Sequence, residues 1–252
     1  MIKITKHQKY SENYDEITEF WKQGKGRKFL MDKYQISSST LHGILQRLNL
    51  PNKEPKSVKL SKYELSVLIG TILGDSHILR GSSKTSSLNF AHSQDKKEYF
   101  YNKVKILESL KFVYIKEKEN LDKRTNKYYK ICTCTSSSFK ELKDLRNIFY
   151  KDGKKVLPIE YLEDNFDKTS LAYLYMDDGS TQKYNTIIST QSFNTEDLQK
   201  FIILLKNKFD LNFTIQFNNT IRLKQKDVKK FKDLIREDVE KIECMKYKIM
   251  SS

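Results

Sequence analysis

Hydrophobic and polar positions divide the chain into a short helical part and a longer mixed part. In the first part, apolar residues recur every three or four positions, which is the spacing of one helix face. Three such segments lie at residues 11–21, 27–34 and 40–48. A serine cluster at 37–39 provides a cap for the third helix. A polar stretch with two prolines then indicates an extended linker, so we predict a small all-α domain with its linker over residues 1–57.

In the second part, helical and strand patterns alternate in an order that occurs twice. The first set comprises an apolar helix at 62–73, a strand at 87–93, a helix at 95–110, strands at 112–118 and 127–135, and a helix at 137–150. The second set comprises an apolar helix at 170–177, a strand at 186–192, a helix at 195–208, a hairpin of 213–218 and 220–225, and a helix at 228–239. Repetition at about 100 residues indicates two related α+β units, predicted at 58–160 and 161–252.

The charge of the chain narrows the class of partner. Its 252 residues include 47 Lys and Arg against 32 Asp and Glu, a net charge of +15. Such a surplus is typical of proteins that bind nucleic acid or an anionic membrane surface, although an AT-rich genome also enriches lysine. The sequence lacks an apolar run of the about 18 residues that a bilayer span needs. Nucleic acid is therefore the favoured partner, and no membrane association is expected.

The N-terminus and the cysteines indicate an intracellular protein. The first residues, MIKITKHQKY, lack the apolar stretch of a signal peptide. Three cysteines in so long a chain favour a reducing compartment. Cys132 and Cys134 are two apart on a predicted strand, where packing is a better interpretation than a zinc site. We expect the cytoplasm of a bacterial or phage-infected cell, or an organelle.

The two apolar helices that begin the repeats end in related sequences, LIGTILGDS at 68–76 and LAYLYMDDG at 171–179. Each places a carboxylate at a helix C-terminus, where the helix dipole is unfavourable for an anion. Gly70 and Gly74 share one helix face and permit a second helix to approach closely. Close approach would bring Asp75 and Asp178 together, and a divalent cation such as Mg²⁺ would offset their repulsion.

These segments resemble the paired motifs of LAGLIDADG homing endonucleases. The flanking stretches KKVLP at 154–158, STQSF at 189–193 and MKYK at 245–248 resemble single-chain members of the I-SceI type. The resemblance covers roughly residues 60–250 and not the N-terminal part. It implies an α+β fold of two pseudo-symmetric repeats with antiparallel saddle sheets, which lie on double-stranded DNA. It also implies a monomer that cleaves a specific site, as in intron homing, with Mg²⁺, for which Mn²⁺ can substitute.

The resemblance further implies the active-site residues. The catalytic residues would be Asp75, Asp178, Lys155 and Lys248, and the metal ligands Asp75, Asp178, Gly74 and Asp177. The glycine and the second-motif Asp177 would contribute backbone carbonyls, and the Asp177 side chain is expected to be structural. The two lysines would stabilise transition-state charge or orient water near the scissile phosphates. Ser76 and Tyr173 depart from the usual small residues of the motif and affect its packing geometry.

Residues that contact DNA are expected on one face of each sheet and on the third N-terminal helix. Side chains alternate along a strand, so polar residues two apart share a face. The candidates on the strands are Lys116, Lys118, Gln216, Arg222 and Lys224. Arg80 and Lys84 are candidates in the loop that leaves the first motif, and His92 and Gln191, which lie at similar places after the two motifs, are candidates at the periphery of the active site. If the N-terminal helices form a helix-turn-helix, its second helix would read bases through Ser39, Thr40, His42 and Arg47. The alternative is a small helical bundle that only packs on the main domain.

The main alternative function is a DNA-binding protein that keeps this fold without cleavage, such as a transcription regulator or an intron maturase. The presence of both acids and both lysines favours the nuclease, because a drifting enzyme is expected to lose at least one of them. An RNA-binding protein has less support, because the stacking aromatics of the common RNA modules are missing from the sequence.

Overall fold

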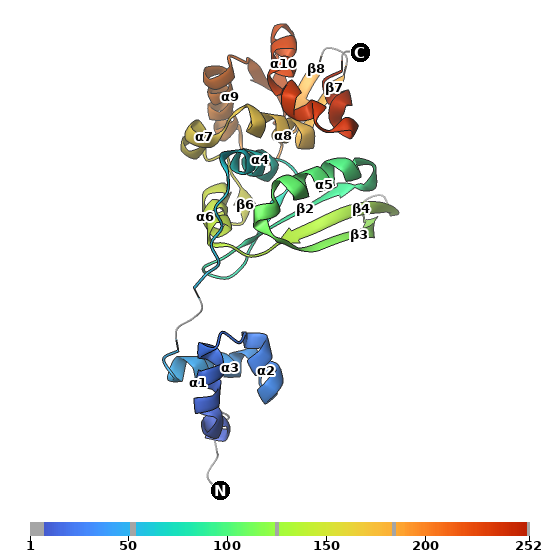
Figure 1. Cartoon of the computed structure of the whole chain (residues 1–252). Helices are drawn as coiled ribbons and strands as arrows, with labels where there is room; N and C mark the ends of the chain where they lie inside the picture. Colours follow the sequence, from blue (N-terminus) through green and yellow to red (C-terminus); the bar gives the residue numbers. More distant parts are fainter. Residues whose placement is uncertain (1–7, 51–53, 124–125, 183–184, 251–252) are drawn as a thin grey trace. The chain divides into compact units, whose positions relative to one another are not determined.

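The computed structural model describes residues 8–50, 54–123, 126–182 and 185–250 (Figure 1). The chain divides into two compact units, Met1–Glu54 and Pro55–Ser252. The second unit begins slightly before the predicted boundary at residue 57, because the backbone next to the prolines already binds the main unit. The Lys140 amide donates to the Lys56 carbonyl at 2.9 Å, and the Val58 amide donates to the Glu141 carboxylate at 2.9 Å.

The N-terminal unit is helical, as predicted. Its elements are η1 (Gln8–Asn13), α1 (Tyr14–Lys22), α2 (Arg27–Tyr34) and α3 (Ser38–Arg47). Its core consists of Ile17, Trp21, Leu30, Ile36, Leu41, Ile44 and Leu45. Gln35 ends α2 in the left-handed conformation (φ 50°), which turns the chain. Ser37 then caps α3 by accepting a hydrogen bond from the Thr40 amide at 3.1 Å.

The first repeat is a four-stranded antiparallel sheet with helices. Its elements are α4 (Lys62–Leu73), β1 (His77–Leu79), β2 (Ser87–Ser93), η2 (Gln94–Lys96), α5 (Lys97–Ile106), η3 (Glu108–Leu110), β3 (Phe112–Asp122), β4 (Lys127–Ser136), α6 (Lys140–Phe149), β5 (Tyr150–Lys151) and β6 (Lys154–Lys155). The strand order is β1-β2-β4-β3, and β5 and β6 form a separate pair. Phe90 on β2 packs against Phe100 on α5, so α5 covers one face of the sheet.

The second repeat follows the same plan. Its elements are α7 (Ile159–Asn165), α8 (Lys168–Asp178), β7 (Gly179–Gln182), β8 (Asn185–Ile188), α9 (Thr195–Phe209), β9 (Phe213–Ile215), β10 (Ile221–Leu223), η4 (Gln225–Asp227), α10 (Val228–Glu240) and η5 (Glu243–Lys248). The strand order β7-β8-β10-β9 matches that of the first sheet, with α8 in the place of α4. The predicted α+β repeat is therefore present. Among the described residues, no helix is both long enough and apolar enough to cross a bilayer.

Helices α4 and α8 pack against each other and join the two repeats (Figure 1). Every residue from Ser66 to Leu73 of α4 and from Thr169 to Asp177 of α8 is buried. Gly70 marks the closest approach: a Cβ atom added there would lie 2.3 Å from the Ser170 carbonyl oxygen and 2.9 Å from the Tyr173 Cβ. Toward the N-terminal ends of the two helices, the Ser66 hydroxyl donates to Asp167 Oδ2 at 2.7 Å across the same interface.

Gly70→Ala is expected to destabilise the main unit by about 1–3 kcal/mol, because the added methyl forces two backbones apart. Urea unfolding followed by circular dichroism measures this change. Gly26→Ala is the control, because a Cβ there meets nothing within 4 Å and Gly26 belongs to the other unit. An unfolding midpoint of the main unit that is equal in Gly70→Ala and in the control would contradict the close packing.

Candidate active site and nucleic-acid interface

The two acids predicted as catalytic lie at the C-terminal ends of the paired helices. Asp75 follows Gly74, the C-cap residue of α4, and Asp178 is the last residue of α8. Burial raises the pKa of Asp178 to about 7, with further contributions from Asp75 and Asp177. Burial also raises the pKa of Asp75, followed by the charge of Asp177. The three carboxylates are therefore close enough to disfavour one another's charge, as the motifs indicated.

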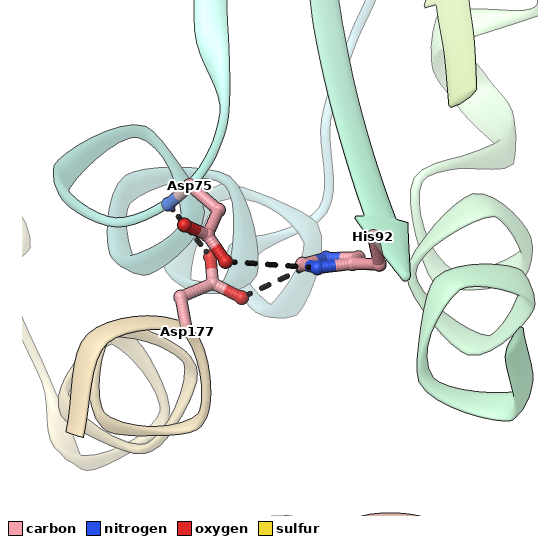
Figure 2. A group of neighbouring side chains, drawn as sticks. All are labelled: Asp75, His92 and Asp177. Atoms are coloured by element: carbon pink, nitrogen blue, oxygen red, sulfur yellow. Dashed lines mark hydrogen bonds and ion pairs between the residues drawn. The ribbon is translucent and has the colours of Figure 1, made fainter. Parts of the chain in front are cut away.

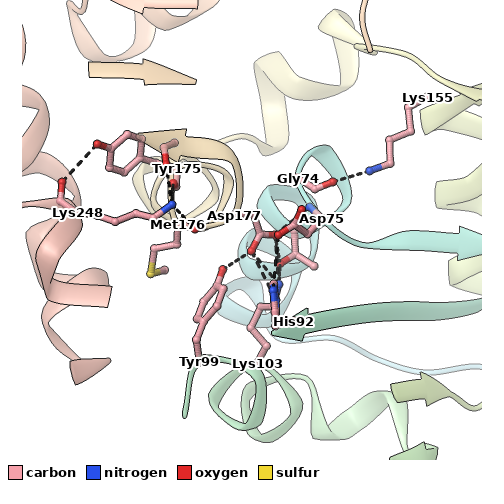
Figure 3. Close-up of polar contacts among 12 residues, drawn as sticks. Gly74, Asp75, His92, Tyr99, Lys103, Lys155, Tyr175, Met176, Asp177 and Lys248 are labelled. Carbon is pink, nitrogen blue, oxygen red and sulfur yellow. Dashed lines mark hydrogen bonds and ion pairs between the residues drawn. The ribbon is translucent and has the colours of Figure 1, made fainter. Parts of the chain in front are cut away.

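Two lysines, both predicted from the flanking sequences, bind the same helix ends (Figure 3). The Lys155 ammonium donates to the Gly74 carbonyl at 2.6 Å. The Lys248 ammonium donates to the carbonyls of Met176 at 2.6 Å and Gly179 at 2.7 Å. The last carbonyls of a helix lack partners within the helix and carry its negative dipole end, so a cation there is stabilising. Each motif helix thus has its own lysine. These lysines offset part of the negative charge at the helix ends, which the sequence analysis expected a metal ion to offset.

Burial lowers the pKa values of both lysines. It lowers the pKa of Lys155, and it lowers the pKa of Lys248 to about 8, with nearby Lys96 acting in the same direction. Lys248 is only 4% exposed. An ammonium held inside the protein by carbonyls loses little entropy when a phosphate approaches, so these groups are suited to act on negative charge that develops nearby.

Asp177 differs from Asp75 and Asp178, because its side chain is fully buried and points into the first repeat (Figure 3). It accepts hydrogen bonds from the Tyr99 hydroxyl at 2.6 Å and the Lys103 ammonium at 3.0 Å. Burial raises the pKa of Asp177, but the charge of Lys103 and the smaller contributions of its other neighbours, including the hydrogen bond from Tyr99, together outweigh burial, and the net shift of the pKa is downward. A structural Asp177 was expected from the sequence, whereas its partners were not.

The helix pattern contained a signal for these partners. Lys103 follows Tyr99 by four positions and Phe100 by three, so it lies on the apolar face of α5. A lysine in that place needs an anion, because an unpaired buried charge is too costly. The sequence does not say which of the 32 acids supplies it, since Asp177 is 74 residues away.

His92 lies beside the acids and not on an exposed surface (Figure 2). It is 6% exposed, with Nδ1 3.6 Å from Asp75 Oδ2 and Nε2 3.8 Å from Asp177 Oδ1. Burial, and then the charge of Lys103, lower the pKa of His92 to about 3, so the ring is neutral at physiological pH. The register of β2 places it on the same face as Phe90, toward α5. Its predicted DNA contact therefore has no support from its position.

The acidic groups fit a divalent cation. Each of Asp75, His92 and Asp177 offers one ligand atom, and these atoms lie within 4.8 Å of one another. Lys103 already neutralises Asp177, however, so the carboxylates with charge still to be balanced are those of Asp75 and Asp178. Asp75 is 42% exposed at its side chain and so accessible to an ion from solvent. Two such carboxylates near helix-end carbonyls form the oxygen donor set that Mg²⁺ prefers.

The sheet faces opposite the helices carry polar side chains. In the first sheet, Lys116 is paired with Thr133 and Lys118 with Ile131, so both lysines point away from α5. In the second sheet, Arg222 pairs with Thr214 on the exposed face and also contacts Asn185. The other predicted DNA-contacting residues of this unit, apart from His92, are exposed or half-exposed: Arg80, Lys84, Gln191, Gln216 and Lys224.

The predicted reading positions of α3 are also accessible. Ser39, His42 and Arg47 are exposed, and Thr40 is half-exposed. The hydroxyls of Ser39 and Thr40 each lie 2.9 Å from the Ser37 hydroxyl, so both take part in the cap of the helix. Their availability to DNA is therefore lower than that of His42 and Arg47.

The fold and site define a pseudo-symmetric protein in which two acid-tipped helices meet within one chain. Residues 65–231 match the LAGLIDADG DNA endonuclease family, and the chain belongs to that family. It is 29% identical over 236 residues to the probable intron-encoded endonuclease 1 of Wickerhamomyces canadensis, which covers 88% of this chain and 99% of the relative. It is 27% identical over 184 residues to the cytochrome b mRNA maturase bI2 of Saccharomyces cerevisiae, which covers 68% of this chain and 43% of the maturase.

A solved structure supports the same assignment. The homing endonuclease I-WcaI bound to its DNA recognition sequence has a TM-score of 0.70 with 27% identity, covering 77% of this chain and 88% of that chain. The family resemblance and the α+β fold predicted from the sequence are thereby confirmed. The helix-turn-helix role of the N-terminal unit stays a prediction.

Proposed function

We propose that this protein is a sequence-specific endonuclease that hydrolyses both strands of double-stranded DNA with a divalent metal, Mg²⁺ in the first place. The observation that carries the proposal is the pairing at the helix ends: an acid, Asp75 or Asp178, lies at the C-terminal end of each motif helix, and each helix end binds its own lysine. Family membership and the DNA-bound state of I-WcaI support it. Because one chain contains both helices, a monomer is sufficient for the site.

The roles of the residues follow from their positions. Asp75 and Asp178 would hold the metal, and the carbonyls of Gly74 and Asp177 would complete its ligands. Bound metal supplies Lewis acidity and an activated water for attack on a phosphodiester. Lys155 and Lys248 would place a positive charge at each helix end, where it stabilises negative charge on a phosphate oxygen. Asp177 is not assigned to the metal through its carboxylate, because Lys103 and Tyr99 occupy it.

DNA is expected to lie across the open sheet faces. Lys116, Lys118 and Arg222 there would contact the major groove, and each good base contact contributes about 1–3 kcal/mol of discrimination. The remaining surface lysines would bind phosphates, so affinity is expected to fall steeply as salt increases. Strands β3 and β4 have 11 and 10 residues, whereas β9 and β10 have three each. The first repeat therefore offers the longer reading surface.

The N-terminal unit is proposed to add a second DNA contact through α3. His42→Ala combined with Arg47→Ala is expected to weaken target binding by about 10-fold or more, since one base-contacting arginine contributes about 1–3 kcal/mol. The cleavage rate at saturating protein should not change. Lys28→Ala, an exposed residue of α2, is the control. Nuclease footprinting would show the difference, and a footprint and affinity equal to the control would mean that this unit does not read DNA.

The alternative is a protein of the same fold that binds DNA and does not cut it, and one relative bears the name of an mRNA maturase and not of an endonuclease. One experiment separates the two functions. A randomised duplex library is bound to the protein in Ca²⁺, the retained DNA is amplified and sequenced, and the selected duplex is then transferred to Mg²⁺. Breaks in both strands at a fixed position support the nuclease, whereas a selected duplex that stays intact in Mg²⁺ supports the alternative.

A further inference from the structure

We propose that Asp177 is a positioning residue for Asp75, and that cleavage of one DNA strand depends on it more than cleavage of the other. The inference rests on the proposed nuclease function. It concerns how the catalytic acid of the first repeat is fixed by a side chain of the second repeat.

Asp177 lies in the second repeat, but its carboxylate binds groups of the first repeat. Among the described residues, the hydrogen bonds that its carboxylate accepts all come from the first repeat. The donors are the Asp75 amide at 3.2 Å, the Thr71 hydroxyl at 3.3 Å, the Tyr99 hydroxyl at 2.6 Å and the Lys103 ammonium at 3.0 Å. The first of these is at the backbone of the catalytic acid itself, so the place of Asp75 depends on where the Asp177 carboxylate lies.

The first motif has no side chain that could position Asp178 in the same way. The position of the first motif that corresponds to Asp177 is Gly74, which has no side chain to reach toward Asp178. A Cβ atom added at Gly74 would lie 2.6 Å from the Asp177 Cβ and 2.7 Å from its Oδ2. The glycine thus leaves the space that the carboxylate fills. The two halves of the site are asymmetric at this point, although their motif helices are related.

The surroundings keep the carboxylate in that space. The side chains of Asp177 and Lys103 are both 0% exposed. Lys103 also lies 3.0 Å from the Thr71 hydroxyl, so its ammonium is held from the α4 side as well. The His92 ring lies beside both carboxylates, with Nδ1 3.6 Å from Asp75 Oδ2 and Nε2 3.8 Å from Asp177 Oδ1, and among the described side chains its Nε2 is buried without a hydrogen-bond partner. A shift of Asp177 would therefore disturb Asp75 through its amide and through the neighbouring ring.

The first test is cleavage by the Asp177→Asn variant, with a plasmid that carries the selected target as the substrate. Its amide group cannot satisfy Lys103 and Tyr99 as a carboxylate does, so the position of Asp75 is expected to relax. A displacement of about 1 Å can slow a reaction about 100-fold, so cutting of one strand should slow by about 10-fold or more relative to the other. Nicked circles should then accumulate before linear product. Equal slowing of both strands would overturn the proposal and leave Asp177 as a purely structural residue.

Asp167→Asn is the matched control. Asp167 is an acid of the same helix pair that binds Ser66 across the interface, at the end remote from Asp75. It should reduce stability without changing the ratio of the two strand-cleavage rates. If Asp167→Asn also accumulates nicked circles, the effect belongs to the interface in general and the proposal is wrong.

A second measurement does not require cleavage. Lys103→Met combined with Asp177→Ala removes both members of the buried pair, which leaves no uncompensated charge. Amide hydrogen exchange at Asp75 is expected to accelerate by about 10-fold or more in this variant, because the amide loses its acceptor. It should not change in Asp167→Asn. Unaltered exchange would overturn the positioning role even if the wild-type protein cuts no DNA, an outcome that would separately refute the proposed function.

Discussion

Asp178→Asn is expected to reduce double-strand cleavage by about 10³-fold or more, which corresponds to about 4 kcal/mol of transition-state stabilisation. The asparagine keeps the size of the side chain but loses the charge that, with Asp75, would hold the metal. The fold should not suffer, because Asp178 is destabilised by burial and by Asp75 and Asp177 in the free protein. The thermal midpoint without metal is therefore expected to be equal to that of the wild type or higher.

Single-turnover cleavage of the selected target in Mg²⁺, together with affinity measured in Ca²⁺, tests this prediction. Asp164→Asn, an exposed acid on α7, is the control and should cut at the wild-type rate. Cleavage by Asp178→Asn within a few-fold of the control would show that the acid pair is not the catalytic centre. Loss of folding in Asp178→Asn would contradict the charge repulsion inferred for this site.

Lys103→Met is expected to destabilise the main unit by about 3–5 kcal/mol, because it leaves the buried Asp177 carboxylate without its cation. Tyr99 and Thr71 retain their hydrogen bonds to Asp177, but neither carries charge. Lys105→Met removes an exposed lysine from the same helix and should change stability by less than about 0.5 kcal/mol. Urea unfolding by circular dichroism compares the two, and equal midpoints would mean that the pair does not stabilise the fold.

The long elements could be predicted from the sequence and the short ones could not. The predicted bounds of α2, α4 and β2 agree with the structure, because each has enough residues for a clear period. Strand β1 has three residues and β7 has four, too few to show alternation, and both were missed. The hairpin of β9 and β10 was predicted too long: its strands end at Ile215 and begin again at Ile221, around a turn in which Asn219 has φ 58°.

The candidate site was predictable to the extent that its residues are consecutive or flank the motifs. Asp178 is the last residue of α8 and Asp75 follows the C-cap of α4, and both locations are visible in the sequence. The partners of Asp177 are separated from it by more than 70 residues, so no local pattern connects them. His92 shows a different limit. Alternation assigns residues to the two faces of a strand, but only the packing of Phe90 against α5 shows which face is interior.

Strand-by-strand cleavage of the selected duplex over a titration of Mg²⁺ tests the central claim most directly. Each strand is labelled at one end and the break positions are mapped on a sequencing gel. The proposed function predicts one fixed break in each strand, with both breaks absent when EDTA removes the metal. A duplex that binds the protein tightly yet stays intact at saturating Mg²⁺ would contradict it and leave a DNA-binding protein with the fold of an endonuclease.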